Sequence, residues 1–365
     1  MNHLPLKGVR VLDLSRVLAG PLCAMQLGDL GADVIKIERP GVGDESRAWG
    51  PPWDAAGVSA YFLCCNRNKL GVAADLDDRA GAALVQKLIA GADIVVENFL
   101  AEALERRGLG ADAMVARNPR LIWCTIQGFA RDPTRPGYDY VVQAESGWMS
   151  ITGEPTGAPM KVGVALADVL AAKEAAVAVL AALSGLRAGA GVQRRVRISL
   201  HEAAVAALVN VAQNALVTGA PASRWGNAHP NLVPYELFDA ADRPVVIAVG
   251  NDSQYTALVG VLGDAALADA RFATNAGRVA AREEVVALVR AAIRKAPAAA
   301  WMERLREAGV PAGIVRSVRQ ALEGADASSA SGVGPQPPGA VRRPPPALDE
   351  HGALVRSRGW DAFAP

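Results

Sequence analysis

Short apolar, β-branched runs alternate with helical segments along the first half of the chain. The runs lie at residues 9–14, 33–37, 93–96 and 121–126, and helical spacing appears near 21–30 and 79–90. Alternation of strands and helices predicts a parallel sheet joined by right-handed crossovers. The first part of the sequence therefore predicts an α/β fold with a Rossmann-like parallel sheet.

Two long apolar segments follow, at residues 169–186 and 200–217, where Ala, Val and Leu recur at helical spacing. Few polar residues interrupt either segment, so both helices are expected to be buried on several faces. After Pro221 the pattern changes to a strand at 245–249 and amphipathic helices up to about Gly309. This second pattern is typical of a smaller α+β domain.

The change of pattern divides the chain into two domains. We expect residues 1–220 to form the large domain and residues 221–323 the small one. Residues 324–347 are rich in Gly, Ala, Ser and Pro and cannot bury enough apolar surface to fold alone, which predicts an exposed linker. Residues 330–365 are expected to return to the large domain.

Composition narrows the classes of partner. The 365 residues are 51% hydrophobic and 21% charged, enough to bury a large core, and 38 Lys and Arg against 37 Asp and Glu leave a net charge of +1. A chain this close to neutrality has no global field that favours nucleic acid or an anionic membrane surface. We expect neither as a partner.

The spacing of the cysteines indicates whether the chain can bind a metal ion, and the N-terminal residues indicate its cellular compartment. The cysteines show no CxxC or Cys/His spacing of a zinc site, so no metal is expected; they are Cys23, Cys64, Cys65 and Cys124. The first residues lack the apolar core of a signal peptide. Charged residues interrupt the longest apolar helix, at Asp168, Lys173 and Glu174. A cytoplasmic protein is expected.

A dinucleotide site is not supported by the loop after the first strand. Residues 15–21 lack the GxGxxG glycines that let backbone approach a pyrophosphate. Glu38 ends the second strand, where a ribose-binding carboxylate would lie, but the neighbouring Arg39 suits a phosphate better. Both residues can also be read as a solvated strand end. No permanently bound cofactor is expected.

Asp168 opens the long alanine-rich helix after an apolar approach and has two interpretations. As a helix cap it accepts backbone N–H bonds and stays ionised. As a nucleophile the same ionised oxygen attacks an activated carbonyl. The helix N-terminus is expected to keep the carboxylate ionised, so capping and catalysis are compatible.

Several of these segments together resemble the class III, or CaiB/BaiF-type, CoA-transferases. The similar blocks are residues 8–21, residues 31–38 followed by Gly43 and Asp44, residues 96–99, residues 137–139, and residues 162–170 around Asp168. The resemblance covers residues 6–320. It implies an interlocked homodimer and a reaction in which Asp168 forms first a mixed anhydride and then an aspartyl-CoA thioester.

The resemblance also implies which residues bind CoA and acyl-CoA, the substrates. Leu18 and Ala19 would line the CoA channel and Arg39 would meet the adenosine-phosphate end. The remaining positions would flank the nucleotide, the pantetheine and the diphosphate: Ala74, Asp75, Asn98, Phe99, Arg106 and Tyr138. Two departures stand out, because Leu100-Ala101 replaces the Pro-Gly frequent after Asn-Phe, and the C-terminal region is short.

Two other functions share this fold. A racemase of the α-methylacyl-CoA type has His at the position of Tyr138, and a tyrosine that titrates near ~10 is a poor acid–base at neutrality. A catalytically inactive acyl-CoA-binding relative is the non-enzyme alternative, and the presence of Asp168 argues against it.

Residues 43–52, and residues 224–229 followed by 233–235, are most similar to succinyl-CoA:glutarate CoA-transferases within the family. The resemblance implies succinyl-CoA or a similar dicarboxylyl-CoA as donor and a small carboxylic acid as acceptor. Arg47 is a candidate for gripping the remote carboxylate, with its guanidinium held in bidentate geometry. A loop salt bridge is the other interpretation of Arg47.

Overall fold

Six parallel strands form the central sheet of the computed structural model, which describes residues 4–364. Their order is β3-β2-β1-β4-β5-β6. The strands are β1 (Arg10–Asp13), β2 (Asp33–Glu38), β3 (Lys69–Ala73), β4 (Ile94–Glu97), β5 (Ile122–Gln127) and β6 (Arg195–Ser199). The expected Rossmann-like parallel sheet is confirmed. Because the strand order reverses between β1 and β4, the loops after these strands open a crevice at the carboxyl edge of the sheet.

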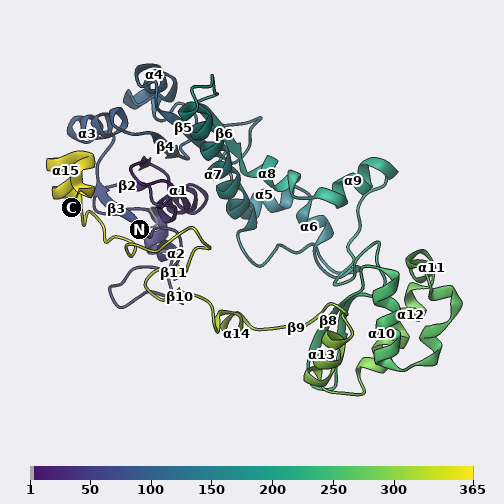
Figure 1. Cartoon of the computed structure of the whole chain (residues 1–365). Helices are drawn as coiled ribbons and strands as arrows, with labels where there is room; N and C mark the ends of the chain where they lie inside the picture. Colours follow the sequence, from purple (N-terminus) through teal and green to yellow (C-terminus); the bar gives the residue numbers. More distant parts are fainter. Residues whose placement is uncertain (1–3, 365) are drawn as a thin grey trace. The chain divides into compact units, whose positions relative to one another are not determined.

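Alternate residues of each strand feed two apolar cores, one on each face of the sheet (Figure 1). Val11 and Val34 pack toward α1 (Ala19–Asp29) and α7 (Leu166–Arg187), whereas Leu12 and Ile35 pack toward α3 (Arg79–Ala90). The remaining helices of this part are η1 (Glu45–Ala48), α2 (Ala60–Leu63), η2 (Glu105–Arg107), α4 (Ala111–Arg117), α5 (Asp139–Glu145), α6 (Trp148–Ile151), α8 (Leu200–Ala206), α9 (Val209–Thr218), α15 (Gly352–Arg358) and η5 (Gly359–Phe363). The period of two along each strand thus explains how a fully covered sheet arises from continuous apolar runs.

The chain divides into two compact units. The first unit comprises residues 4–149, 161–221 and 325–364 of the described chain. The second unit comprises residues 150–160 and 222–324. The second unit has the antiparallel sheet β7 (Tyr235–Asp239), β8 (Pro244–Ala248) and β9 (Ala312–Ile314). Its helices are α10 (Asp252–Leu262), η3 (Ala265–Ala268), η4 (Ala270–Phe272), α11 (Asn275–Ala280), α12 (Arg282–Ile293), α13 (Ala298–Glu307) and α14 (Val318–Leu322).

The apolar segment expected as one buried helix at 200–217 is two helices. The axes of α8 and α9 differ by 71°, and the break falls where Val209 has a φ of 38°. None of the residues of α9 is buried, and Val209, Leu216 and Val217 are 70%, 78% and 75% exposed. The expectation of burial is therefore wrong for α9, because helical spacing of apolar residues does not say what covers them.

The expected linker makes specific contacts with the first unit. It forms the hairpin β10 (Ala327–Ser328) and β11 (Gly332–Val333), and Arg67 donates to the carbonyls of Ser331 and Val333 at 2.9 and 2.6 Å. Residues 340–347 pass the end of α1, where the Ala340 amide donates to the Asp29 carbonyl, and then the start of β3, where the Asn68 amide donates to the Arg343 carbonyl. Most of the segment is exposed, but backbone hydrogen bonds fix it despite its low apolar content.

The C-terminal residues dock on the same unit despite the shortened region noted in the sequence. The Trp360 ring is buried, and its Nε1 donates to the Leu88 carbonyl at 2.9 Å. Helix α7 is long and apolar enough to cross a membrane by length and composition, but it contacts α1, β5, β6 and α8. This packing is that of the core helix of an α/β unit.

Candidate functional site

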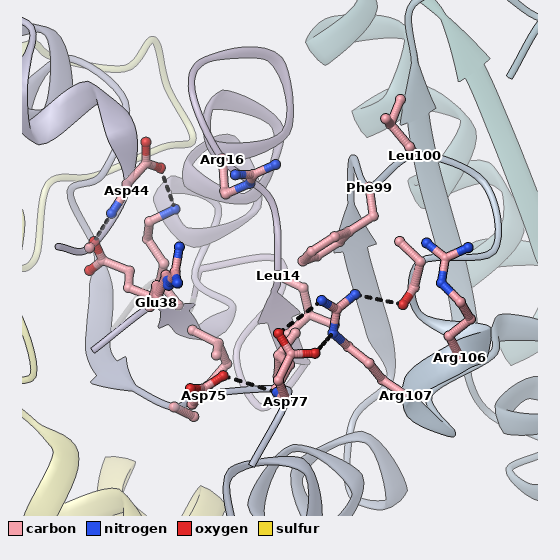
Figure 2. A pocket seen from close by; sticks show the side chains of 17 residues that line it. Leu14, Arg16, Glu38, Asp44, Asp75, Asp77, Phe99, Leu100, Arg106 and Arg107 are labelled. Atoms are coloured by element: carbon pink, nitrogen blue, oxygen red, sulfur yellow. Dashed lines mark hydrogen bonds and ion pairs between the residues drawn. The ribbon is translucent and has the colours of Figure 1, made fainter. Parts of the chain in front are cut away.

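Two adjoining cavities lie in the crevice at the carboxyl edge of the sheet, where the reversal of strand order places loops from β1 and β4. The smaller, of about 200 Å³, contains Asp168. The larger, of about 410 Å³, is lined by charged side chains (Figure 2). Arg16, Phe99 and Leu100 line both cavities, so an extended ligand can reach from one to the other. We call them the aspartate cavity and the arginine cavity.

Asp168 lies in the first turn of α7 but does not cap it. The N-cap residue is Ala165, which makes no side-chain cap, and the Ala167 amide donates instead to Oδ1 of Asp139 at 2.9 Å. Gln143, which is fully buried, donates to Oδ2 of Asp139 at 2.7 Å and accepts from the Val162 amide at 2.8 Å. Asp139 therefore takes the capping role that the sequence assigned to Asp168, and the Asp168 carboxylate is left for the cavity.

The environment of Asp168 opposes its ionisation. Burial, followed by the negative charge of Asp139, raises the pKa of Asp168 to about 7, and the hydrogen bond from the Ala19 amide only partly offsets these effects. Asp168 is thus harder to ionise than its place at a helix N-terminus led us to expect, because burial and Asp139 outweigh the hydrogen bond from the Ala19 amide. Tyr61 of α2 also faces this group, since burial and then the charge of Asp168 raise the pKa of Tyr61.

Ala19 is the first residue of α1, and it brings a helix N-terminus to the reactive side of the aspartate cavity. No acidic side chain occupies the first turn of α1. Unsatisfied backbone N–H groups at such a helix end stabilise negative charge. The cavity thus combines a carboxylate of raised pKa with the N–H donor of Ala19 at a helix N-terminus, which favours negative charge there.

The arginine cavity collects most of the residues expected to meet the nucleotide end of CoA. Arg39, Ala74, Asp75, Phe99 and Arg106 all line it. Two further arginines, Arg16 and Arg107, line it as well and were not among the predicted residues. Figure 2 shows Arg107 held by Asp77, with Nε and Oδ1 2.7 Å apart. Several guanidinium groups in one cavity suit a ligand that carries phosphates.

The aspartate cavity collects the other predicted residues: Leu18, Ala19, Asn98, Phe99, Tyr138 and Asp168. The Asn98 side chain is largely committed to the protein backbone. Its Oδ1 accepts from the Arg16 amide at 2.9 Å, and its Nδ2 donates to the Arg16 carbonyl at 2.7 Å. Asn98 thus ties the loop after β4 to the loop after β1. Tyr138 precedes α5 and is 54% exposed.

Arg47 lines neither cavity. Its Nε and Nη2 lie 2.7 and 2.8 Å from the carboxylate oxygens of Glu38, Nη2 also donates to the Pro346 carbonyl, and the guanidinium stacks 3.6 Å from the centre of the Phe62 ring. The guanidinium is thus engaged by Glu38, Pro346 and Phe62, which favours a structural role over that of carboxylate clamp. The alternative interpretation, a loop salt bridge, describes Arg47.

The site residues missed from the sequence lay next to residues that were noticed. Asp139 belongs to the block 137–139 and Arg16 to the block 8–21, but neither position signalled a role by its residue type. Asp139 acts on a helix that begins 27 residues later in the chain, at Leu166. Only the fold brings these residues together.

Comparison with known proteins agrees with this arrangement. The model of CoA-transferase family III matches residues 6–352. A succinate–glutarate CoA-transferase of Agrobacterium fabrum is 41% identical over 96% of this chain and 94% of that protein. The succinyl-CoA:glutarate CoA-transferase of Mus musculus is 40% identical over 86% of this chain and 73% of that protein.

Solved structures lead to the same family. A CaiB/BaiF family protein from Brucella suis superposes with a TM-score of 0.85 and 38% identity, covering 98% of this chain and 99% of that one. The match extends over both the parallel-sheet unit and the smaller antiparallel one. The chain belongs to CoA-transferase family III.

Proposed function

We propose that this enzyme moves CoA from succinyl-CoA, or a similar dicarboxylyl-CoA, to a carboxylic acid acceptor, with Asp168 as the nucleophile. The observation that carries the proposal is the position of Asp168, whose carboxylate faces a cavity that adjoins the arginine-lined one. The names of the related enzymes support succinyl-CoA as donor and glutarate as acceptor.

The reaction proceeds by a series of nucleophilic substitutions at acyl carbonyl carbons. The ionised Asp168 attacks the thioester carbonyl and the C–S bond breaks. The products are a mixed anhydride between Asp168 and the donor acid, and CoA as a thiolate. The thiolate then attacks the aspartyl carbonyl of the anhydride, which forms an aspartyl-CoA thioester and releases the donor acid as a carboxylate. The acceptor carboxylate attacks this thioester, and the same two steps in reverse yield the new acyl-CoA.

The electrostatics of the aspartate cavity favour this sequence. Ionised Asp168 is buried beside Asp139, and acylation converts it into an uncharged carbonyl group. The repulsion and desolvation that raise the pKa of Asp168 are therefore relieved as the anhydride forms. The amide of Ala19, at the start of α1, is placed to stabilise negative charge on a carbonyl oxygen.

The arginine cavity supplies the binding of CoA. Arg39 and Arg106 contact its phosphates, Ala74 and Asp75 flank the nucleotide, and Phe99 lies where the ligand passes between the cavities. Leu18, Ala19, Asn98 and Tyr138 line the path toward Asp168. CoA and acyl-CoA are substrates in this scheme, and no permanently bound cofactor takes part.

The enzyme works as a homodimer in this proposal, and in the cytoplasm. Helix α9 supports the dimer because its apolar residues Val209, Leu216 and Val217 are mostly exposed to water in the single chain. The occupant is a second copy of the chain, as the family resemblance implies.

Exchange of labelled succinate into succinyl-CoA tests the proposed reaction without knowledge of the acceptor. The wild type is expected to catalyse exchange, and Asp168→Asn to lose it by several orders of magnitude. Asp112→Asn is the matched control, because Asp112 is a first-turn carboxylate of α4 that lines neither cavity. Full exchange by Asp168→Asn would refute the role of Asp168.

A further inference from the structure

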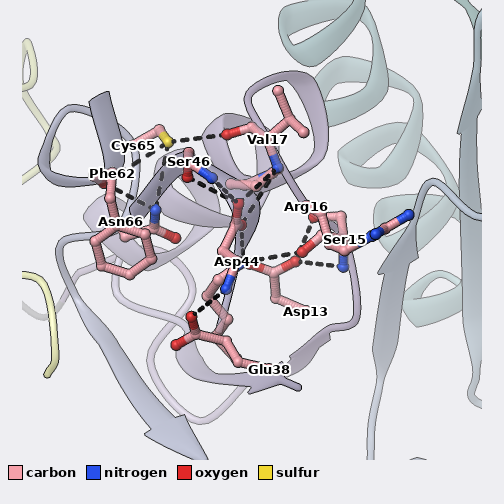
Figure 3. Close-up of polar contacts among 12 residues, drawn as sticks. Asp13, Ser15, Arg16, Val17, Glu38, Asp44, Ser46, Phe62, Cys65 and Asn66 are labelled. Atoms are coloured by element: carbon pink, nitrogen blue, oxygen red, sulfur yellow. Dashed lines mark hydrogen bonds and ion pairs between the residues drawn. The ribbon is translucent and has the colours of Figure 1, made fainter. Parts of the chain in front are cut away.

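The loop after β1 is held by side-chain hydrogen bonds, from the neighbouring Asp13 and from residues far along the chain (Figure 3). The Ser15 amide donates to Asp13 at 2.9 Å, and the Ser15 carbonyl accepts from Nζ of Lys36 at 2.9 Å. Asn98 satisfies both the amide and the carbonyl of Arg16. A loop with this many side-chain anchors has one backbone path imposed on it.

Val17 has an unfavourable backbone conformation within this loop. Its φ is 71°, in the left-handed region, where a β-branched side chain is strongly disfavoured. Its amide donates to Oδ1 of Asp44 at 3.1 Å, and its carbonyl accepts from Sγ of Cys65 at 3.6 Å. These contacts must offset the strain, because Val17 lies outside β1 and α1 and makes no ladder or helix hydrogen bond of its own.

Asp44 connects the strained residue to a buried ionic network. Its Oδ2 lies 3.0 Å from Nζ of Lys36, and a second pair joins Lys69 to Asp13 at 2.8 Å. All four side chains are fully buried, and their formal charges cancel. Burial raises the pKa of Asp44, but the Lys36 charge and hydrogen bonds from Ser46 outweigh it and lower that pKa to about 2. Asp44 is therefore an ionised acceptor at any working pH.

The strained loop leads directly to the aspartate cavity. Val17 is followed by Leu18, the N-cap of α1, and then by Ala19, whose amide hydrogen-bonds Asp168. A shift of the Val17 peptide would move the start of α1 relative to the Asp168 carboxylate. Displacements of about 1 Å in such groups can cost about 10²-fold in rate.

We infer that Asp44, paired with Lys36, is a positioning residue that fixes Val17 in its left-handed conformation and so aligns the first amides of α1 with Asp168. This inference rests on the proposed role of Asp168 as nucleophile. It assigns the Lys36–Asp44 pair a part in turnover without contact with the reacting atoms.

A second-site rescue separates positioning from stability. Asp44→Asn keeps the shape of the side chain but removes the charge that pairs with Lys36, and kcat is expected to fall roughly 10- to 100-fold, with a smaller change in KM. Val17→Gly allows the left-handed conformation without strain. Combined with Asp44→Asn, it is expected to restore most of the lost kcat. Because Val17→Gly also relieves strain in the folded state, kcat is measured well below the melting temperature of every variant, so that recovered stability alone cannot raise it.

Asp29→Asn is the matched control. Asp29 is 3% exposed and pairs with Arg67 at 2.7 Å, but it lies at the other end of α1. We expect it to lower the melting temperature with kcat retained. If Asp44→Asn does not fold, the double variant Lys36→Met with Asp44→Asn is used instead, because it removes both charges of the buried pair. Val17→Gly is then tested in that double variant.

The rate at which hydroxylamine-trappable label from succinyl-CoA appears on Asp168 is measured for each variant. The inference is supported if the Asp44 variant is labelled slowly, if Val17→Gly restores its labelling rate, and if Asp29→Asn is labelled as fast as the wild type. Labelling of the Asp44 variant at the Asp29→Asn rate, or a loss that Val17→Gly leaves unchanged, overturns it. Absence of label from wild-type Asp168 overturns the proposed function instead.

Discussion

At the scale of single residues, the charge of Asp168 decides when the enzyme can react. Its pKa is raised to about 7 by burial and by Asp139, and only the ionised form attacks a carbonyl. A raised pKa lowers the fraction of reactive carboxylate but increases the basicity of the fraction present. A carboxylate of this kind is characteristic of a functional site rather than a helix cap.

The first prediction concerns pH. The rate of Asp168 acylation is expected to fall as pH drops through about 7, since protonation removes the nucleophile. Asp139→Asn removes the neighbouring charge and retains an oxygen that caps α7, so it should move this acid limb to lower pH. The other titratable residues that line the cavity are Arg16, Glu45, Arg135 and Tyr138, and burial and then the charge of Asp168 raise the pKa of Tyr61. Single-turnover rates from pH 5 to 9 measure the shift, and an unmoved limb would contradict the role of Asp139.

The second prediction concerns stability. Because the pKa of Asp168 is raised above 3.8 on folding, the folded state binds more protons between about pH 4 and 7. The protonated Asp168 carboxyl group contributes fully to the free energy of unfolding below about pH 4. This contribution is lost as pH rises through about 7. Asp168→Asn stays neutral, so it should be more stable than wild type at pH 8, by about 2–4 kcal/mol. Urea unfolding at pH 5 and pH 8 tests this, and equal differences at both pH values would disprove it.

The third prediction concerns Arg47. Arg47→Met leaves the buried carboxylate of Glu38 without its partner, and breaking a buried pair costs about 3–5 kcal/mol. The preference for glutarate over acetate as acceptor should stay unchanged, because the guanidinium lies outside the aspartate cavity. Thermal unfolding and acceptor competition give the two readouts. Loss of dicarboxylate preference in a stable variant would restore the clamp interpretation.

At the scale of elements, periodicity predicted four of the six strands of the parallel sheet and did not identify β3 and β6. The runs at 9–14, 33–37, 93–96 and 121–126 correspond to β1, β2, β4 and β5, because apolar residues on both faces of a strand signal a doubly covered sheet. The sequence pattern did not reveal where α8 and α9 divide, since Leu208 and Val209 are apolar and continue the helical spacing.

Some residues of the candidate site could be predicted from the sequence and others could not, because only some of them are brought together by the order of the strands. Residues in loops directly after strands, such as Arg39 and Asn98, are brought together by the parallel topology itself. Asp139 and Arg107 act across long sequence distances. The sequence left two interpretations of Arg47 open, because a guanidinium in a loop looks the same whether it binds a ligand or Glu38. Partners of a charged group are set by packing, which local pattern does not encode.

At the scale of the whole molecule, the exposed apolar residues of α9 require a cover. The fourth prediction is a dimer that persists on dilution, since the interlocked chains implied by the family must unfold to separate. Sedimentation at nanomolar concentration should show a dimer. Replacement of Leu216 and Val217 on α9, which are 78% and 75% exposed, by Glu should impair its assembly, whereas the same change at exposed Val246 of β8 should not. A folded monomer of the wild type at nanomolar concentration would contradict this prediction.

The central claim is that Asp168 carries the acyl group and then CoA. The most direct measurement incubates the enzyme with succinyl-CoA alone, treats it with hydroxylamine or borohydride, and maps the modified carboxyl group by mass spectrometry. Modification is predicted at Asp168, dependent on succinyl-CoA and absent from Asp168→Asn. An unmodified Asp168, together with a nearly fully active Asp168→Asn variant, would contradict the account.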